Sequence, residues 1–148
     1  MVTAQKVAKY FLSKVEEDVG DGISNLKLQK LVYYAQAYHL AMYGEPLFAE
    51  QVEAWEHGPV IPTLYREYKQ YGSGNIPPPE DFDPNDYDAQ ATELMDEVYE
   101  VFGQYSAWKL RNLTHQERPW SEAYEDGARG RVISPGSMRE FYKQYVTE

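Results

Sequence analysis

The sequence contains no cysteine, and this absence excludes several kinds of protein at once. Without cysteine the chain has no disulfide framework, no thiolate nucleophile and no zinc site built on sulfur. A chain of 148 residues does not need disulfide or metal cross-links to fold, because a domain of this size buries about two-thirds of its unfolded surface on folding. The sequence therefore predicts one domain spanning residues 1–148, with one core, and we expect it in a reducing compartment, the cytoplasm.

Long apolar runs and a secretion signal are also missing. The N-terminal stretch MVTAQKVAKYFLSKVEEDVG alternates lysine with apolar residues, whereas a signal peptide has an unbroken apolar region. The most apolar run, from Leu31 to Met42, contains Gln36 and His39. It is shorter than the roughly 20 residues that a membrane-spanning helix needs. We expect a soluble protein without a membrane partner.

Basic residues are scarce and unevenly placed. The chain has 14 Lys and Arg against 24 Asp and Glu, a formal net charge of -10, which is the wrong sign for binding nucleic acid directly. No base lies between Gln70 and Trp108, a stretch that holds the acids Glu80, Asp81, Asp83, Asp86, Asp88, Glu93, Asp96, Glu97 and Glu100. Such a block is either a solvated face or a surface that steers a basic protein partner.

Apolar residues at helical spacing predict a mainly α, single-domain bundle of about six helical segments. The expected starts and stops are Thr3 and Gly20, Ser24 or Asn25 and Gly44, Pro62 and Gly72, Asp88 and Gly103, Ser106 and Pro119, and a last start at Ser134-Pro135. The second segment is apolar nearly all round, so we expect it at the centre of the bundle, with other elements on several sides.

Two stretches between these helices are not predicted to be helical. Residues 51–56 favour an extended conformation and allow a small β-hairpin near residues 47–56. Residues 73–87 contain three consecutive prolines, which exclude helix, so we predict a mobile surface loop there.

Prolines also shape the stretch EAWEHGPVIPTLYREY, residues 53–68. Each residue before a proline favours extended geometry, so Gly58 and Ile61 should be non-helical and the chain should form an elbow before Pro62. We interpret Trp55 as a buried anchor of this elbow, with His57 as one candidate partner for its indole N–H. Residues 114–120 repeat the pattern of polar groups, a proline and then Trp120. Scaffold, ligand contact and catalysis all stay open for these turns, and we favour scaffold.

Reactive groups form no recognisable catalytic or metal-binding pattern in the sequence. His39, His57 and His115 lie on separate segments, and the spacing H-E-x-x-H, the P-loop and the G-x-S-x-G elbow are absent. His39 is most simply a hydrogen-bonded core histidine. We therefore predict no catalytic residue, no metal and no cofactor. A small hydrolase or metal-dependent enzyme using His57 and His115 is kept as an alternative.

Three stretches in order, NLKLQKLVYYAQAYHLAMYGEPLF, EAWEHGPVIPTLYREYKQYG and LTHQERPWSEAY, resemble the successive signatures of the Panacea family, also described as SocA-like or phage GepA-like domains. The resemblance implies a small, mainly helical bacterial or prophage antitoxin that binds and neutralises a co-encoded toxin. It also implies an alternative, because one branch acts as an adaptor that delivers its toxin to a Clp-type protease. Family members pair with unrelated toxins, so the resemblance does not identify the partner.

The matching positions should belong to the scaffold, because the signature persists while the partners differ. They are Gln29, Lys30, Tyr34, Trp55, His57, Gly58, Pro59, Pro62, Tyr65, Thr114, His115, Pro119 and Trp120. We expect toxin contacts on more individual surface instead. The candidates are Asp81, Phe82, Asp83, Asp86, Tyr87 and Asp88.

Overall fold

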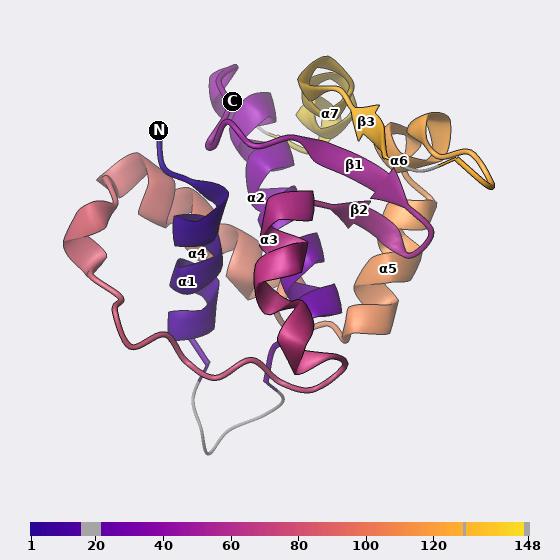
Figure 1. The fold of residues 1–148 in the computed structure, drawn as a ribbon. Helices are drawn as coiled ribbons and strands as arrows, with labels where there is room; N and C mark the ends of the chain where they lie inside the picture. The colour runs from indigo at the N-terminus through magenta and orange to yellow at the C-terminus, as the bar shows by residue number, and fades with distance from the viewer. Residues whose placement is uncertain (16–21, 129, 147–148) are drawn as a thin grey trace.

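The computed structural model describes residues 1–15, 22–128 and 130–146, and within these ranges it is mainly α, as predicted (Figure 1). Seven α-helices and three short strands lie in the described ranges. The helices are α1 (Ala4–Ser13), α2 (Asn25–Tyr43), α3 (Pro62–Tyr68), α4 (Ala89–Phe102), α5 (Ala107–His115), α6 (Arg118–Ala123) and α7 (Pro135–Tyr142), and the strands are β1 (Val52–Trp55), β2 (Gly58–Val60) and β3 (Arg131–Ile133). Their buried apolar residues form one cluster.

Helix α2 is the central element, which confirms the prediction from its apolar character. Fourteen of its 19 residues are buried, and α1, α3, α4, α5 and α7 all contact it. Figure 1 shows α1 and α4 on one side of it and α5 on the other. None of the helices in the described ranges is long and apolar enough to cross a membrane.

Side-chain caps begin most helices where the sequence predicts. The hydroxyls of Thr3, Ser24, Ser106 and Ser134 each accept a backbone N–H from the first turn that follows. Gly44 ends α2 in the left-handed region, at φ 73°. The predicted end of the first helix at Gly20 falls outside the described residues.

The extended stretch after α2 is a hairpin, but it lies later in the chain than residues 47–56. Strands β1 and β2 pair antiparallel with Trp55 opposite Gly58, so the elbow itself forms the second strand. Pro59 is tolerated there because β2 is an edge strand and needs no second row of N–H donors. The sequence analysis missed β3, which pairs with the other edge of β1 and has only three residues.

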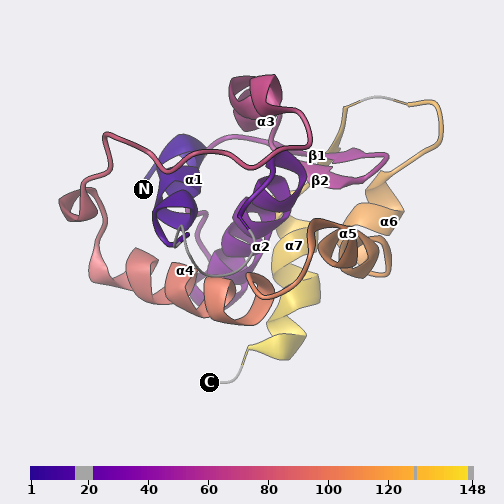
Figure 2. The ribbon, with the colours of Figure 1, turned by 90° about the horizontal axis from the view of Figure 1, so that it is seen from below.

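Residues 73–87 cross α1 on their way to α4 (Figure 2). The hydroxyl of Tyr87 donates to the carbonyl of Lys6 at 2.6 Å. The rings of Tyr87 and Phe82 pack against Tyr10, with centroids 5.2 and 6.1 Å away. The segment lacks α-helix, as predicted, and contains one 3-10 turn, Pro84–Asp86. These contacts attach the segment to α1, and its predicted mobility stays a prediction.

Gln36 shows how the buried helix organises the chain that follows it. Its side chain is 3% exposed, and its Oε1 accepts the N–H groups of Leu47, at 2.7 Å, and Phe48, at 3.3 Å. Its Nε2 donates to the carbonyl of Phe48 at 2.8 Å. One side chain of α2 therefore satisfies three buried backbone groups.

Replacing Gln36 with Met keeps a similar volume but leaves these three backbone groups without partners. Because each unpaired buried polar group costs about 1–3 kcal/mol, we expect Gln36→Met to lower the free energy of unfolding by about 3 kcal/mol or more in urea denaturation. The control is Gln144→Met, at an exposed position, which should cost less than about 0.5 kcal/mol. Equal effects of the two changes would contradict this role of Gln36.

Candidate functional site

Two polar side chains of α2, Gln29 and Lys30, join the central helix to the hairpin and to α3. Lys30 is completely buried, and its Nζ donates to the carbonyl of Pro59 at 3.0 Å. The Oε1 of Gln29 accepts the N–H of Ile61 at 2.9 Å, and its Nε2 donates to Asn25 Oδ1 at 2.9 Å. We call Gln29 and Lys30 the α2 clamp, because both hold backbone at the end of β2.

The α2 clamp fits only if residue 58 is glycine. Gly58 has φ +114°, and a Cβ there would lie 2.5 Å from Lys30 Cε and 2.9 Å from Thr114 Oγ1. Both neighbours are buried. The close approach of hairpin, α2 and α5 at this point therefore requires the missing side chain as well as the unusual backbone angle.

The two Trp-containing turns, which are distant in sequence, meet in the structure. The indole N–H of Trp120 donates to the carbonyl of Trp55 at 2.8 Å, and the ring of Trp120 stacks on His115 at 3.8 Å. Trp120 is buried, whereas Trp55 is half-buried. The indole N–H of Trp55 donates to Glu53 Oε1 at 2.9 Å, so the suggestion that His57 accepts it is wrong.

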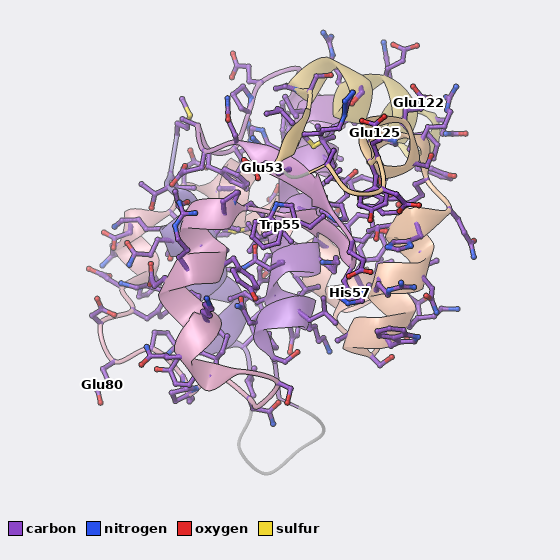
Figure 3. The ribbon with its side chains drawn as sticks, turned by 45° about the vertical axis from the view of Figure 1, so that its right-hand side comes forward. Glu53, Trp55, His57, Glu80, Glu122 and Glu125 are labelled. Carbon is purple, nitrogen blue, oxygen red and sulfur yellow. The ribbon has the colours of Figure 1, made fainter. Side chains whose placement is uncertain are left out.

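His57 and His115 are both close to the contact between Trp55 and Trp120, but their surroundings differ. His57 stands at the end of the hairpin beside α5 (Figure 3), with a half-exposed side chain. Its Nδ1 accepts from Arg111 Nε at 3.3 Å. Burial, together with the nearby charges of Arg111 and Lys30, lowers the pKa of His115 to about 4. His39 is separate, and its Nδ1 lies 2.6 Å from the carbonyl of Glu45, as expected for a core histidine.

The surroundings of the histidines disfavour a bound cation, and those of His115 also disfavour general-base catalysis. The guanidinium of Arg111 donates to His57, and its positive charge contributes to the lowered pKa of His115, so it opposes a second cation there. In the described ranges no group of three His, Asp or Glu side chains is placed to hold a metal ion. A catalytic base needs access to substrate and a pKa near the working pH, whereas His115 stacks on Trp120 and its pKa lies far below neutrality.

A second buried network joins α2 to α7 and includes a residue that the sequence analysis missed. Glu117 Oε1 accepts the hydroxyls of Tyr34 at 2.8 Å and Tyr142 at 2.7 Å. The hydroxyl of Tyr142 lies 2.9 Å from that of Tyr33. Burial raises the pKa of the Glu117 carboxyl, which the two hydroxyl donors partly offset. The sequence feature that could have identified Glu117 is its position directly before Arg118-Pro119, inside a signature stretch.

The six predicted partner residues all have contacts within the chain. Asp81 and Asp86 pair with Lys9 and Lys6, each at 2.7 Å. Asp83 caps the 3-10 turn that follows it, and Asp88 caps α4. The other two, Phe82 and Tyr87, are half-buried against α1. The side chain of Asp81 is nevertheless 73% exposed, so it can still face a partner.

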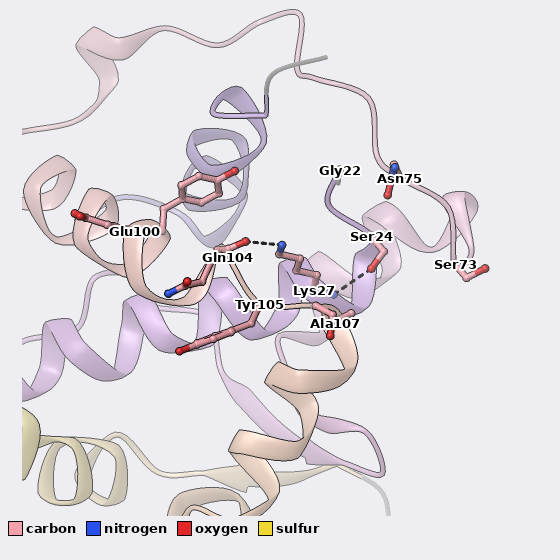
Figure 4. A pocket seen from close by; sticks show the side chains of 12 residues that line it. Gly22, Ser24, Lys27, Ser73, Asn75, Glu100, Gln104, Tyr105 and Ala107 are labelled. Atoms are coloured by element: carbon pink, nitrogen blue, oxygen red, sulfur yellow. Dashed lines mark hydrogen bonds between the residues drawn. The ribbon is translucent and has the colours of Figure 1, made fainter. Parts of the chain in front are cut away.

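A pocket of about 640 Å³ lies between the start of α2 and the connection from α4 to α5 (Figure 4). Two of its hydroxyls, from Ser24 and Ser106, accept helix N–H groups as caps. The Nζ of Lys27 donates to the carbonyl of Gly103 at 2.6 Å. A serine nucleophile needs an adjacent general base, and the lining contains no histidine and one carboxylate, that of Glu100. The bonds of Ser24, Ser106 and Lys27 therefore stabilise helix ends.

The fold and these contacts define a small helical protein in which Lys30 bonds to Pro59 and Trp120 to Trp55 inside the structure. Residues 28–121 match the family model described as Antitoxin SocA-like, Panacea domain, and the chain belongs to this family. It is 42% identical over 71 residues to Antitoxin SocA of Caulobacter vibrioides (strain NA1000 / CB15N). That match covers 48% of this chain and 37% of the relative. No solved structure matches. The family resemblance of the sequence is thereby confirmed.

Gly58→Ala tests the close approach of the hairpin to α2. We expect it to lower the free energy of unfolding by about 2 kcal/mol more than Gly72→Ala, because a positive φ strains both variants but overpacking affects only the first. Gly72 has φ +55° and no heavy atom within 4 Å of its built Cβ. Thermal and urea unfolding measure both variants. Equal losses would show that the contact with Lys30 and Thr114 is unimportant.

The buried amine of Lys30 should make the stability of the protein depend on pH. Burial lowers the pKa of its amine from 10.5 to about 7, so between these values the unfolded chain binds a proton that the folded chain has released. Stability from this group should therefore rise with pH above about 7, by at most about 1.4 kcal/mol per pH unit. We expect the free energy of unfolding of the parent, minus that of Lys30→Met, to rise from pH 7 to 9 and to stay level from pH 5 to 6. A difference independent of pH would contradict a neutral buried lysine.

Proposed function

We propose that this protein is an antitoxin-like interaction module that binds and neutralises a co-encoded bacterial or prophage toxin, and that it acts in the cytoplasm without a cofactor. The family match over residues 28–121 carries the proposal, because the family is described by its antitoxin. The contacts support it. The α2 clamp, Gly58 and Trp120 hold elements of the fold together, as a scaffold for binding requires.

The same contacts favour a non-enzymatic role over the alternative that uses His57 and His115. His57 accepts a hydrogen bond from Arg111, and the pKa of His115 is about 4. Neither histidine has a carboxylate or hydroxyl partner that would activate it in the manner of a catalytic pair, among the contacts of the described residues. Glu56 approaches His57 only at 3.9 Å and is itself well exposed.

The protease-adaptor alternative stays a prediction of the resemblance. It differs from simple inhibition in needing a Clp-type protease as second partner. The acidic residues from Glu80 to Glu100 keep a proposed part in steering a basic toxin, because exposed charges act chiefly on the rate of encounter.

The decisive experiment expresses this chain and the product of the neighbouring reading frame from separate inducible promoters in bacteria. We expect the neighbour alone to arrest growth, co-expression of this chain to restore it, and the two proteins to elute as one complex in size-exclusion chromatography. A host without Clp proteases separates the two modes, since an inhibitor still protects there and an adaptor does not. A toxic neighbour that is neither bound nor neutralised by the folded chain would refute the proposal.

A further inference from the structure

One exposed cluster of aromatic and basic side chains lies where α5 meets the hairpin. Trp108 is 55% exposed, and the guanidinium of Arg111 lies over its ring, 4.4 Å from the centroid. The ring of His57 lies 5.8 Å from that of Trp108. We call these three residues, His57, Trp108 and Arg111, the α5 patch.

The α5 patch is a positively charged spot on an acidic protein. In the described part of the chain no carboxylate pairs with Arg111, which instead contacts His57, the Asn112 side chain and the Trp108 ring. The buried amine of Lys30 is close enough for the charge of Arg111 to lower its pKa. Glu56 lies 3.9 Å from His57 at the edge of the patch, and its side chain is 78% exposed.

The geometry holds Arg111 ready for a planar anionic group. Its Nε donates to His57 and one of its terminal nitrogens to Asn112 Oδ1, at 3.3 and 3.0 Å, while the Trp108 ring supports its face. A guanidinium stacked in this way loses little side-chain entropy when a carboxylate binds its remaining N–H groups. The exposed indole beside it offers apolar area to a neighbouring side chain.

We propose that the α5 patch is the surface that contacts the toxin, and that it receives a toxin segment presenting a carboxylate next to an apolar side chain. The inference rests on the proposed function and deepens it by naming the surface. Trp and Arg are the residue types that most often carry the binding energy of protein interfaces. The patch is built on α5 and the tip of the hairpin. The α2 clamp and Trp120 bond to the hairpin, and the ring of Trp120 stacks on His115 of α5.

We therefore assign different roles in toxin binding to the acidic residues from Glu80 to Glu100 and to the α5 patch. Figure 3 shows Glu80 at the lower left edge of the molecule and His57 well apart from it, right of the centre, and Figure 1 places α5 away from α1. Asp86 and Asp81 already pair with Lys6 and Lys9, so we assign long-range attraction to other exposed acids of this stretch, such as Glu80, Glu97 and Glu100. The α5 patch supplies the short-range contact that sets the dissociation rate.

The test compares Trp108→Ala and Arg111→Glu with two matched controls. Tyr145→Ala removes another aromatic side chain, 56% exposed, and Arg66→Glu reverses another exposed base, on α3. Binding is measured by biolayer interferometry with an inactivated toxin from the neighbouring reading frame. We expect each patch variant to weaken binding at least about 30-fold and each control less than about threefold, all with parental melting temperatures. Arg111→Glu should regain affinity for a toxin in which the contacted Asp or Glu is replaced by Arg.

Three other results would overturn the inference, and they can be distinguished from one another. If the parent binds the toxin and the patch variants bind as the controls do, the α5 patch is not the contact surface and the proposed function stands. If the parent binds no toxin, the proposed function fails and the inference fails with it. If the parent binds a uridine oligonucleotide, and Arg111→Glu abolishes that binding while toxin binding persists, the patch serves nucleic acid instead.

Discussion

The structure depends on one constraint, which is that α2 is buried on nearly every side and its polar side chains must find partners inside the protein. Gln29, Lys30 and Gln36 all bond to backbone that comes later in the chain. Because an unpaired buried polar group costs about 1–3 kcal/mol, these bonds select the path of that backbone from many equally compact ones. The hairpin and the start of α3 are therefore placed by the polar residues of an apolar helix.

The second half of the signature extends this set of contacts to the C-terminal helices. Gly58 lets Lys30 and Thr114 pack against the hairpin, and Trp120 reaches back to the carbonyl of Trp55. Glu117 then joins α2 to α7 through two tyrosine hydroxyls. Lys30, Gly58, Thr114 and Trp120 of the signature are thus connected inside the protein. A fixed interior leaves the outer surface able to differ between proteins of the same fold.

Acidic and basic side chains differ in how far the fold itself pairs them. The formal net charge of -10 does not indicate where on the surface a partner binds. Asp81 and Asp86 are paired with lysines of α1 and Asp83 and Asp88 cap helical turns, so part of the acidic tract is explained by the fold. The guanidinium of Arg111 in the α5 patch, by contrast, has no carboxylate partner among the described residues. An unpaired cation beside an exposed tryptophan is more informative about binding than a larger number of paired acids.

The sequence by itself determined the helices, their capped ends and the central place of α2, because caps such as Ser24 and Gly44 act within one turn and burial on all sides leaves an apolar pattern. It also identified Lys30, Gly58 and Trp120 as a group, through the family signature. Only the tertiary structure decided the register of the hairpin, the presence of β3, the partner of Trp55, the role of Glu117 and the meeting of His57 with Trp108 and Arg111. Each of these rests on contacts between residues distant along the chain or on a choice among several equivalent neighbours. Local residue pattern carries no record of such choices, because they are made by packing.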